Sequence, residues 1–175
     1  MRRRLVLVGI AALTMPAASS ADVVSADRGA LAVRGTIAVT AQPEAVWRML
    51  VRPARWWNKD HTFSGDAANL SLDPRPGGCF CERLPGGGGV VHLRVIYVDP
   101  GKLIRLTGAL GPLQSEPATG VLTVSIKPAG AGAGLSWSYA ANGLSALSGT
   151  DMAPAVDRVL AEQFTRLSTA AAQGR

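Results

Sequence analysis

The chain has 175 residues, of which 47% are hydrophobic, and a formal net charge of +6. Three of its 18 basic residues, Arg2, Arg3 and Arg4, stand in the first four positions, and without them 15 basic residues face 12 acidic ones. The remaining charge is small and scattered, which argues against a nucleic-acid-binding protein. The length suits one domain with a sizeable core.

The first 21 residues have the parts of a secretory signal peptide. The arginines precede an apolar run at 5–15, too short to span a membrane, and small residues follow up to Ala21. We therefore expect a signal peptide at 1–21, export by the general secretory route, a periplasmic location, and no stable membrane insertion after cleavage. The alternative is an uncleaved anchor. Residues 22–29 are expected to form a flexible segment.

The next part of the chain predicts a strand, a short helix and a loop. Apolar residues alternate with others at 30–40, as in a strand with one buried face. Pro43 is tolerated in a first helical turn, and apolar residues at three-to-four spacing follow it, so a short helix is expected to end near Pro53. A polar loop at 60–66 and a short strand at 69–72 come next.

The rest of the chain predicts an antiparallel meander followed by one long helix. Strand-like segments joined by short turns lie at 78–84, 90–98, 103–110, 119–127 and 135–141. From Thr150 or Asp151 to Ala170, apolar residues trace one helical stripe, which should lie on the concave face of the sheet. The predicted fold is therefore α+β, a curved antiparallel sheet wrapped around a long C-terminal helix.

This order of elements resembles the START-like, or SRPBCC, helix-grip superfamily. Within it, the chain is most similar to the branch of polyketide cyclase-like proteins and of the homologues that activate a heat-shock-chaperone ATPase. The resemblance extends over 30–172 and is carried by short motifs in a fixed order: Pro43-Glu-Ala-Val-Trp47, Trp56-Trp57, Gly77-Gly78, the strand-turn-strand around Asp99-Pro100, and the helix at 156–167. It implies a domain at 30–172 with an apolar cavity. Members mostly bind lipids, polyketides or other hydrophobic molecules, and some are enzymes. The export signal departs from the cytosolic chaperone-activator branch.

Cys79 and Cys81 are the sharpest local signal. Two residues apart in a strand, they point to the same face at about 6.6–7 Å, at or beyond the limit for a relaxed disulfide, so a bridge would need a bulge or twist. Three states stay open: two thiols packed in the core, a redox-active or oxidised pair, or a metal site, for which few ligands are available. We expect no metal and no cofactor.

The hairpin register predicts what the cysteines face. If Leu84 pairs with Val90, Cys81 lies opposite Leu93 and Cys79 opposite Val95, so that both cysteines face apolar neighbours and line the cavity. In the same register Glu82 lies opposite His92 on the other face and forms an ion pair with it.

The leading hypothesis is a single-domain exported protein that binds a small hydrophobic molecule between the sheet and the C-terminal helix. The candidate ligand-binding residues are Trp56, Trp57, Cys79, Cys81, Leu93, Trp137, Val156 and Leu160. For the paired tryptophans the alternative is one core residue and one loop anchor.

Two other functions are compatible with the same fold. One is a cyclase- or isomerase-type enzyme in which His61 or Asp66 acts as acid or base, although the alternative for His61 is a solvated surface residue and no inward acid–base pair is identifiable. The other is a protein-interaction module, which a large exposed apolar patch would favour.

Overall fold

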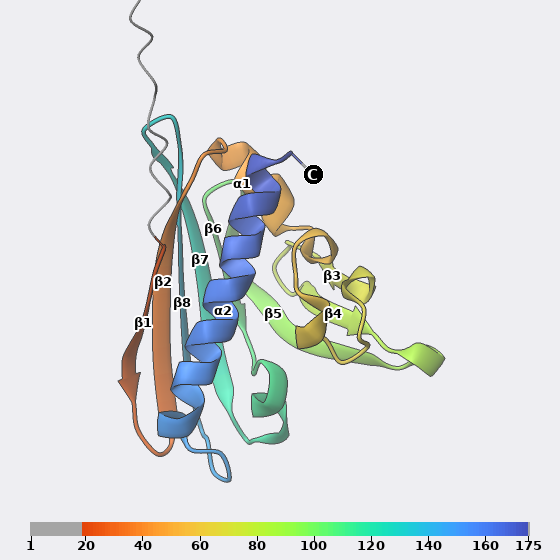
Figure 1. Cartoon of the computed structure of the whole chain (residues 1–175). Helices are drawn as coiled ribbons and strands as arrows, with labels where there is room; N and C mark the ends of the chain where they lie inside the picture. Colours follow the sequence, from red (N-terminus) through yellow and green to blue (C-terminus); the bar gives the residue numbers. More distant parts are fainter. Residues whose placement is uncertain (1–18, 175) are drawn as a thin grey trace, which may run out of the picture.

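The computed structural model describes residues 19–174, which form one antiparallel sheet with a long helix against its concave face (Figure 1). The helices are α1 (Pro43–Leu50) and α2 (Gly149–Ala172). The strands are β1 (Ser19–Ala26), β2 (Ala30–Val39), β3 (Leu70–Leu72), β4 (Cys79–Arg83), β5 (Gly89–Asp99), β6 (Leu103–Thr107), β7 (Thr119–Ala129) and β8 (Gly132–Asn142). Short 3₁₀ turns include η2 (Lys59–His61), η3 (Ala67–Asn69) and η5 (Gly111–Ser115).

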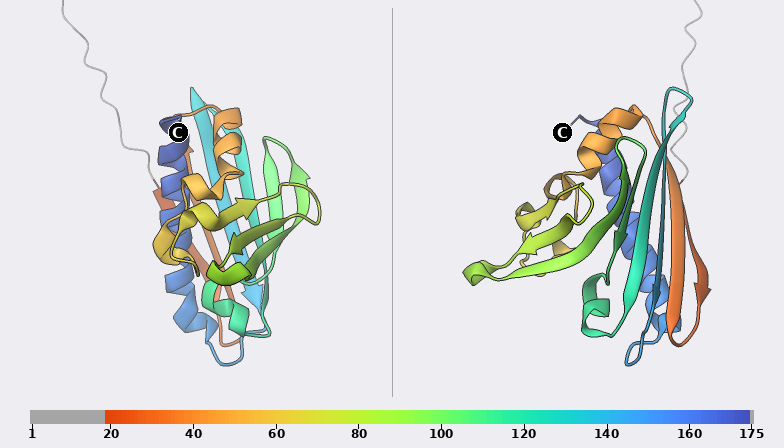
Figure 2. Two further views of the ribbon diagram at one scale, coloured as in Figure 1. Left: turned by 90° about the vertical axis from the view of Figure 1, so that its right-hand side faces the viewer. Right: turned by 180° about the vertical axis from the view of Figure 1, so that it is seen from behind.

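The sheet has eight strands in the order β1-β2-β8-β7-β6-β5-β4-β3. From β3 to β8 each strand pairs with the next one in sequence, and the pairing of β2 with β8 joins the first part of the chain to this meander. Figure 2 shows the sheet bending so that its β3–β5 end turns to the side on which α2 lies. This open, curved sheet around a terminal helix confirms the predicted helix-grip fold.

Helix α2 packs on the sheet through the apolar stripe that the sequence shows. Its buried side chains include Leu160, Phe164 and Leu167, and it contacts β2, β1 and α1. Phe164 stacks on Trp137 of β8, with ring centroids 4.6 Å apart, and lies 6.2 Å from the ring of Trp56. Burying each such side chain contributes about 1.5–3 kcal/mol, so the stripe fixes the helix in the sheet.

The segment predicted to be flexible, 22–29, belongs largely to strand β1. Residues Ser19–Ala26 pair antiparallel with β2, with a register shift between Val23 and Ser25. Val23 and Val24 are both exposed, so this edge strand lacks the apolar alternation by which strands are recognised in a sequence. The predicted signal peptide lies outside the described residues except for Ser19–Ala21, which here begin β1.

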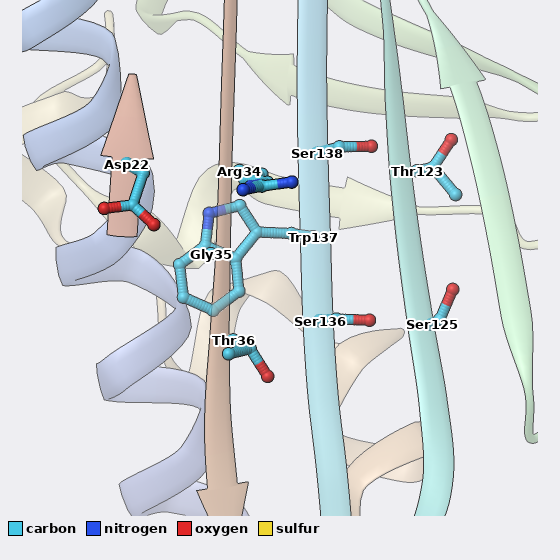
Figure 3. A pocket seen from close by; sticks show the side chains of 9 residues that line it. All are labelled: Asp22, Arg34, Gly35, Thr36, Thr123, Ser125, Ser136, Trp137 and Ser138. Carbon is cyan, nitrogen blue, oxygen red and sulfur yellow. The ribbon is translucent and has the colours of Figure 1, made fainter. Parts of the chain in front are cut away.

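A glycine in β2 makes room for the aromatic ring of β8 that stacks on Phe164 of α2. Gly35 of β2 pairs with Trp137 of β8, and Figure 3 shows the indole lying across Gly35. A Cβ atom at Gly35 would lie 2.1 Å from Cζ2 of Trp137. Only glycine therefore lets this indole lie flat beside the helix.

Substitution Gly35→Ala should lower the free energy of unfolding by about 1–3 kcal/mol, the usual cost of overpacking a core. Gly134→Ala in β8 is the matched control, because its Cβ would meet Ala129 Cβ at 3.8 Å, an ordinary contact. We expect that control to stay within about 0.5 kcal/mol of the parent protein. Denaturant unfolding measures both, and equal losses would contradict the packing argument.

Candidate ligand-binding site

A mainly apolar cavity of about 450 Å³ lies between the first half of α2, the loop at 58–66 and the segment that leads into η5. Its lining comprises Trp57, Asp60, His61, Thr62, Phe63, His92, Leu110, Gly111, Pro112, Met152, Ala155, Val156, Val159 and Leu160. The hollow in Figure 3 is smaller, about 290 Å³, and is lined mainly by Ser and Thr. The larger cavity is therefore the candidate site for an apolar molecule.

Helix α2 supplies one wall of the cavity. Met152, Val156 and Val159 follow one another at helical spacing, line the cavity and are only half-buried. Leu160 is 1% exposed and joins this wall to the core. The helix thus presents apolar surface that the protein itself leaves uncovered.

A tyrosine of the sheet positions the opposite wall. The hydroxyl of Tyr139 donates a hydrogen bond to the Gly108 carbonyl (3.1 Å) and accepts one from the Leu110 N–H (3.3 Å). Gly108 has a φ of 142°, which favours glycine and turns the chain away from β6. Burial raises the pKa of Tyr139 to about 12, so the hydroxyl keeps the proton that it donates.

The loop at 58–66 is fixed to α2 by polar contacts. The Asn58 N–H donates to Oε1 of Gln163 (2.8 Å), and the Asn58 side-chain amide donates to Oε1 of Glu162 (2.6 Å). His61 Nε2 lies 3.3 Å from Oε2 of Glu162, and the Trp57 indole donates to the His61 carbonyl (3.0 Å). These bonds hold the loop against the helix at the rim of the cavity.

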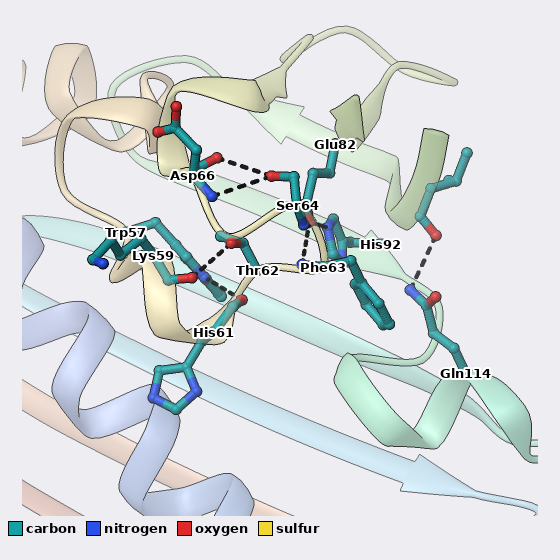
Figure 4. Close-up of polar contacts among 11 residues, drawn as sticks. Trp57, Lys59, His61, Thr62, Phe63, Ser64, Asp66, Glu82, His92 and Gln114 are labelled. Carbon is teal, nitrogen blue, oxygen red and sulfur yellow. Dashed lines mark hydrogen bonds and ion pairs between the residues drawn. The ribbon is translucent and has the colours of Figure 1, made fainter. Parts of the chain in front are cut away.

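The loop is also tied to the sheet, through a buried Glu82–His92 pair (Figure 4). Nε2 of His92 lies 3.0 Å from Oε2 of Glu82, and the carboxylate also accepts hydrogen bonds from the N–H groups of Phe63 and Ser64. The Glu82 side chain is fully buried and that of His92 is 6% exposed. The imidazole also contacts the ring of Phe80, at a centroid distance of 4.9 Å.

The surroundings set the charges of this pair. Burial alone would raise the pKa of the Glu82 carboxyl, but hydrogen bonds from Ser64, Phe63 and His92 outweigh it and hold the pKa below its usual range. Burial lowers the pKa of His92, against a smaller opposing effect of Glu82. Both shifts favour an ionised carboxylate beside a neutral imidazole at neutral pH.

The structure brings three of the predicted ligand-binding residues together at the cavity, namely Trp57, Val156 and Leu160. Trp56, Leu93 and Trp137 lie instead in the core, each 5% exposed or less. The Trp56 indole donates to the Met49 carbonyl (2.9 Å), which holds it beneath α1 rather than in the cavity.

Contrary to the prediction, Cys79 and Cys81 do not line the cavity. In β4 the buried side chains are those of Phe80 and Glu82, while both cysteines are half-buried on the opposite face. They form a disulfide with a Cα–Cα distance of 5.4 Å, so the oxidised state is the one found among the three that the sequence left open.

The predicted register of the β4–β5 hairpin is also wrong. Cys81 pairs with Val91, two residues from the predicted partner, and Cys79 pairs with Arg94, one residue from it, because β5 carries one extra residue opposite the Phe80–Cys81 step. This bulge lets both His92 and Leu93 point inward. The predicted Glu82–His92 ion pair is confirmed, but it faces the concave side of the sheet.

The other residues considered for acid–base chemistry lie at the rim or outside. His61 is at the rim, with a side chain that is 33% exposed, and Asp66 is exposed and caps η3 by accepting from the Ala68 N–H. Sequence reasoning missed His92, Phe63 and Leu110 as cavity residues, because only the bulge and the loop contacts place them there. Met152 and Val159 were visible as members of the α2 stripe.

The part of the chain from 19 to 174 contains no group of three or more His, Cys, Asp and Glu side chains arranged to hold a metal ion. No helix in that part combines the length and apolar character needed to cross a bilayer.

Comparison with known proteins supports the fold. A family model described as "Polyketide cyclase / dehydrase and lipid transport" matches residues 30–172 and confirms the superfamily resemblance. No curated protein matches the chain. The finer likeness to chaperone-activator homologues stays a prediction.

Several solved structures share the fold at low sequence identity. An uncharacterized protein from Rhizobium leguminosarum matches with a TM-score of 0.64 and 16% identity, covering 89% of this chain and 99% of its own. A protein of unknown function from Staphylococcus aureus has a TM-score of 0.60, 14% identity, and coverage of 83% and 96%. Protein CV1439 from Chromobacterium violaceum has a TM-score of 0.54, 20% identity, and coverage of 81% and 96%.

Substitution Glu82→Gln should lower the free energy of unfolding by about 3 kcal/mol, as expected for a broken buried pair. Both carboxylate oxygens accept hydrogen bonds, so either orientation of the amide places its NH₂ group against an N–H donor. Glu162→Gln is the control, because the Glu162 side chain is 39% exposed, and it should cost less than about 1 kcal/mol. Comparable losses in urea unfolding would refute the structural role of Glu82.

Stability should also fall as the pH is lowered below about 6.5, the ordinary pKa of histidine. Because the pKa of His92 is lowered in the folded state, the unfolded chain binds more protons there, and unfolding is favoured by acid. The titratable and charged groups that contact His92 or share a hollow with it are Glu82 on β4, Asp60 and His61 around the cavity, and Arg94 at a second hollow.

The free energy of unfolding should change by at most about 1.4 kcal/mol per pH unit for one proton. We expect this pH dependence to be smaller in His92→Gln. Urea unfolding at a series of pH values measures it. The same slope in parent and variant would show that His92 is not responsible.

Proposed function

Because the chain belongs to the polyketide cyclase / dehydrase and lipid transport family, we propose that it binds a small, largely apolar molecule in the cavity beside α2. The observation that carries the proposal is the accessible apolar wall formed by Met152, Val156 and Val159. The volume of about 450 Å³ lies within the range of small-molecule sites. Covering this wall would contribute about 25 cal/mol per Å² of apolar surface.

The mouth of the cavity supports the same proposal. Phe63 is 55% exposed, which is unusual for a large aromatic residue, and it lines the cavity together with Leu110 and Pro112. A bound molecule would cover these groups and remove their apolar surface from water.

We also propose that the protein acts outside the cytoplasm. The signal-peptide pattern at 1–21 is the first support, and the disulfide between Cys79 and Cys81 is the second, because disulfides persist in oxidising compartments. A fusion of residues 1–29 to a reporter that folds only after export would test the location.

Binding of naphthyl methyl ether, a compact apolar probe, to the full chain tests the site. Val159→Trp should fill the cavity and weaken binding at least tenfold, or about 1.4 kcal/mol. Arg158→Trp adds the same side chain at the neighbouring exposed position and should leave the affinity unchanged. Equilibrium dialysis gives the affinities, and thermal unfolding confirms that both variants are folded. Equal binding by the two variants would mean that the probe binds elsewhere.

A further inference from the structure

We propose that the cavity selects a neutral ligand that carries a hydrogen-bond donor, such as an alcohol, phenol or enol, and that Nδ1 of His92 accepts this hydrogen bond. The inference rests on the proposed function and names the polar group that the bound molecule should present. Glu82 acts as a positioning residue, since it contacts the imidazole and not the ligand.

The neutral imidazole of His92 carries its proton on Nε2. Glu82 is held as a carboxylate by the N–H groups of Phe63 and Ser64, and a carboxylate only accepts hydrogen bonds. Nε2 of His92, 3.0 Å from the carboxylate, must therefore carry a proton. In a neutral imidazole, the other nitrogen, Nδ1, then has a free lone pair.

The lone pair on Nδ1 is left for a bound molecule. His92 lines the cavity, and the residues at 19–174 offer Nδ1 no hydrogen-bond donor. The ring of Phe80 lies 4.9 Å from the imidazole and that of Phe63 lies 5.9 Å from it, measured between centroids, so the imidazole cannot turn without leaving Glu82. Figure 4 shows Phe63 beside His92. The acceptor therefore has a fixed position in a mainly apolar wall.

The charges around His92 disfavour an anionic ligand group at this position. The lining contains no Lys or Arg, and its one carboxylate is that of Asp60. Glu82 adds a second negative charge directly behind His92. A carboxylate or phosphate headgroup would be repelled and would find no donor on Nδ1, whereas an O–H group meets the acceptor that it needs.

Naphthol and naphthyl methyl ether test the proposal, because they differ only in replacing the O–H by O–CH₃. Apolar burial alone favours the ether, which has one more methyl group. We expect the parent protein to bind naphthol at least tenfold more tightly than the ether, and to bind the naphthoate anion more weakly than either. The affinities are measured by equilibrium dialysis.

His92→Phe keeps an aromatic ring between Phe63 and Phe80 but removes the acceptor. The tenfold preference should collapse to about one, through loss of naphthol affinity with the ether affinity retained. A purely structural role for His92 would weaken the binding of both ligands together.

The parent protein provides a second measurement that needs no variant at this position. NMR of the imidazole nitrogens should show the signal of Nδ1 of His92 shifting on addition of naphthol and not of the ether. The chain has two histidines, so His61→Gln assigns the signals.

The outcomes separate the inference from the function on which it rests. Equal binding of naphthol and the ether, or tighter binding of naphthoate, would overturn the role of His92 and leave the cavity as a binding site. Failure of the parent protein to bind any of the three compounds would overturn both proposals.

Discussion

One buried carboxylate holds together the parts of the molecule that form the cavity. Glu82 accepts hydrogen bonds from two backbone N–H groups of the 58–66 loop and from His92 on β5. A buried charge is tolerated only where such partners replace its water, so the loop and the strand are held in place by the same requirement. The loop's other contacts, to Glu162 and Gln163, carry this constraint across to α2. The wall made by the loop therefore has a fixed distance from the wall made by the helix.

The cavity exists because part of the apolar stripe of α2 is only half-buried. Around Phe164 the helix packs on Trp137 and Trp56, and the close approach of Trp137 to Gly35 lets the stack lie flat. Toward its N-terminus the same apolar stripe continues through Val156 and Met152, which line the cavity together with loop residues and His92 of β5. One periodic pattern thus supplies both the core and the binding wall, and a ligand can use the wall without rearranging the core.

Sequence patterns predicted the features that rest on periodicity. The sheet, α2 and its apolar stripe follow from the alternation of period two and the spacing of period 3.6, which side-chain burial imposes directly. Strand β1 was missed because it is held at the edge of the sheet by backbone bonds, while Val23 and Val24 remain exposed. The bulge at His92 was missed because one extra residue in a strand cannot be recognised from the residue types of that strand.

The error in β4 has a different physical origin and bears most on the site. In Cys-Phe-Cys-Glu, period two forces a choice between burying the cysteines and burying Phe80 with Glu82. Burying a carboxylate costs more free energy than burying the cysteines unless hydrogen-bond donors contact the carboxylate, so the sequence alone favoured burial of the cysteines. The donors that reverse this choice come from Phe63 and Ser64, 19 and 18 residues earlier in the chain, and no local pattern announces them. Their effect reaches the ligand, because a neutral imidazole instead of two sulfur atoms then lines the cavity. An apolar site would have selected ligands by shape alone, whereas this cavity also has one hydrogen-bond acceptor in a fixed position. A single hydrogen bond in a site without water distinguishes between two ligands more sharply than additional apolar contact area does.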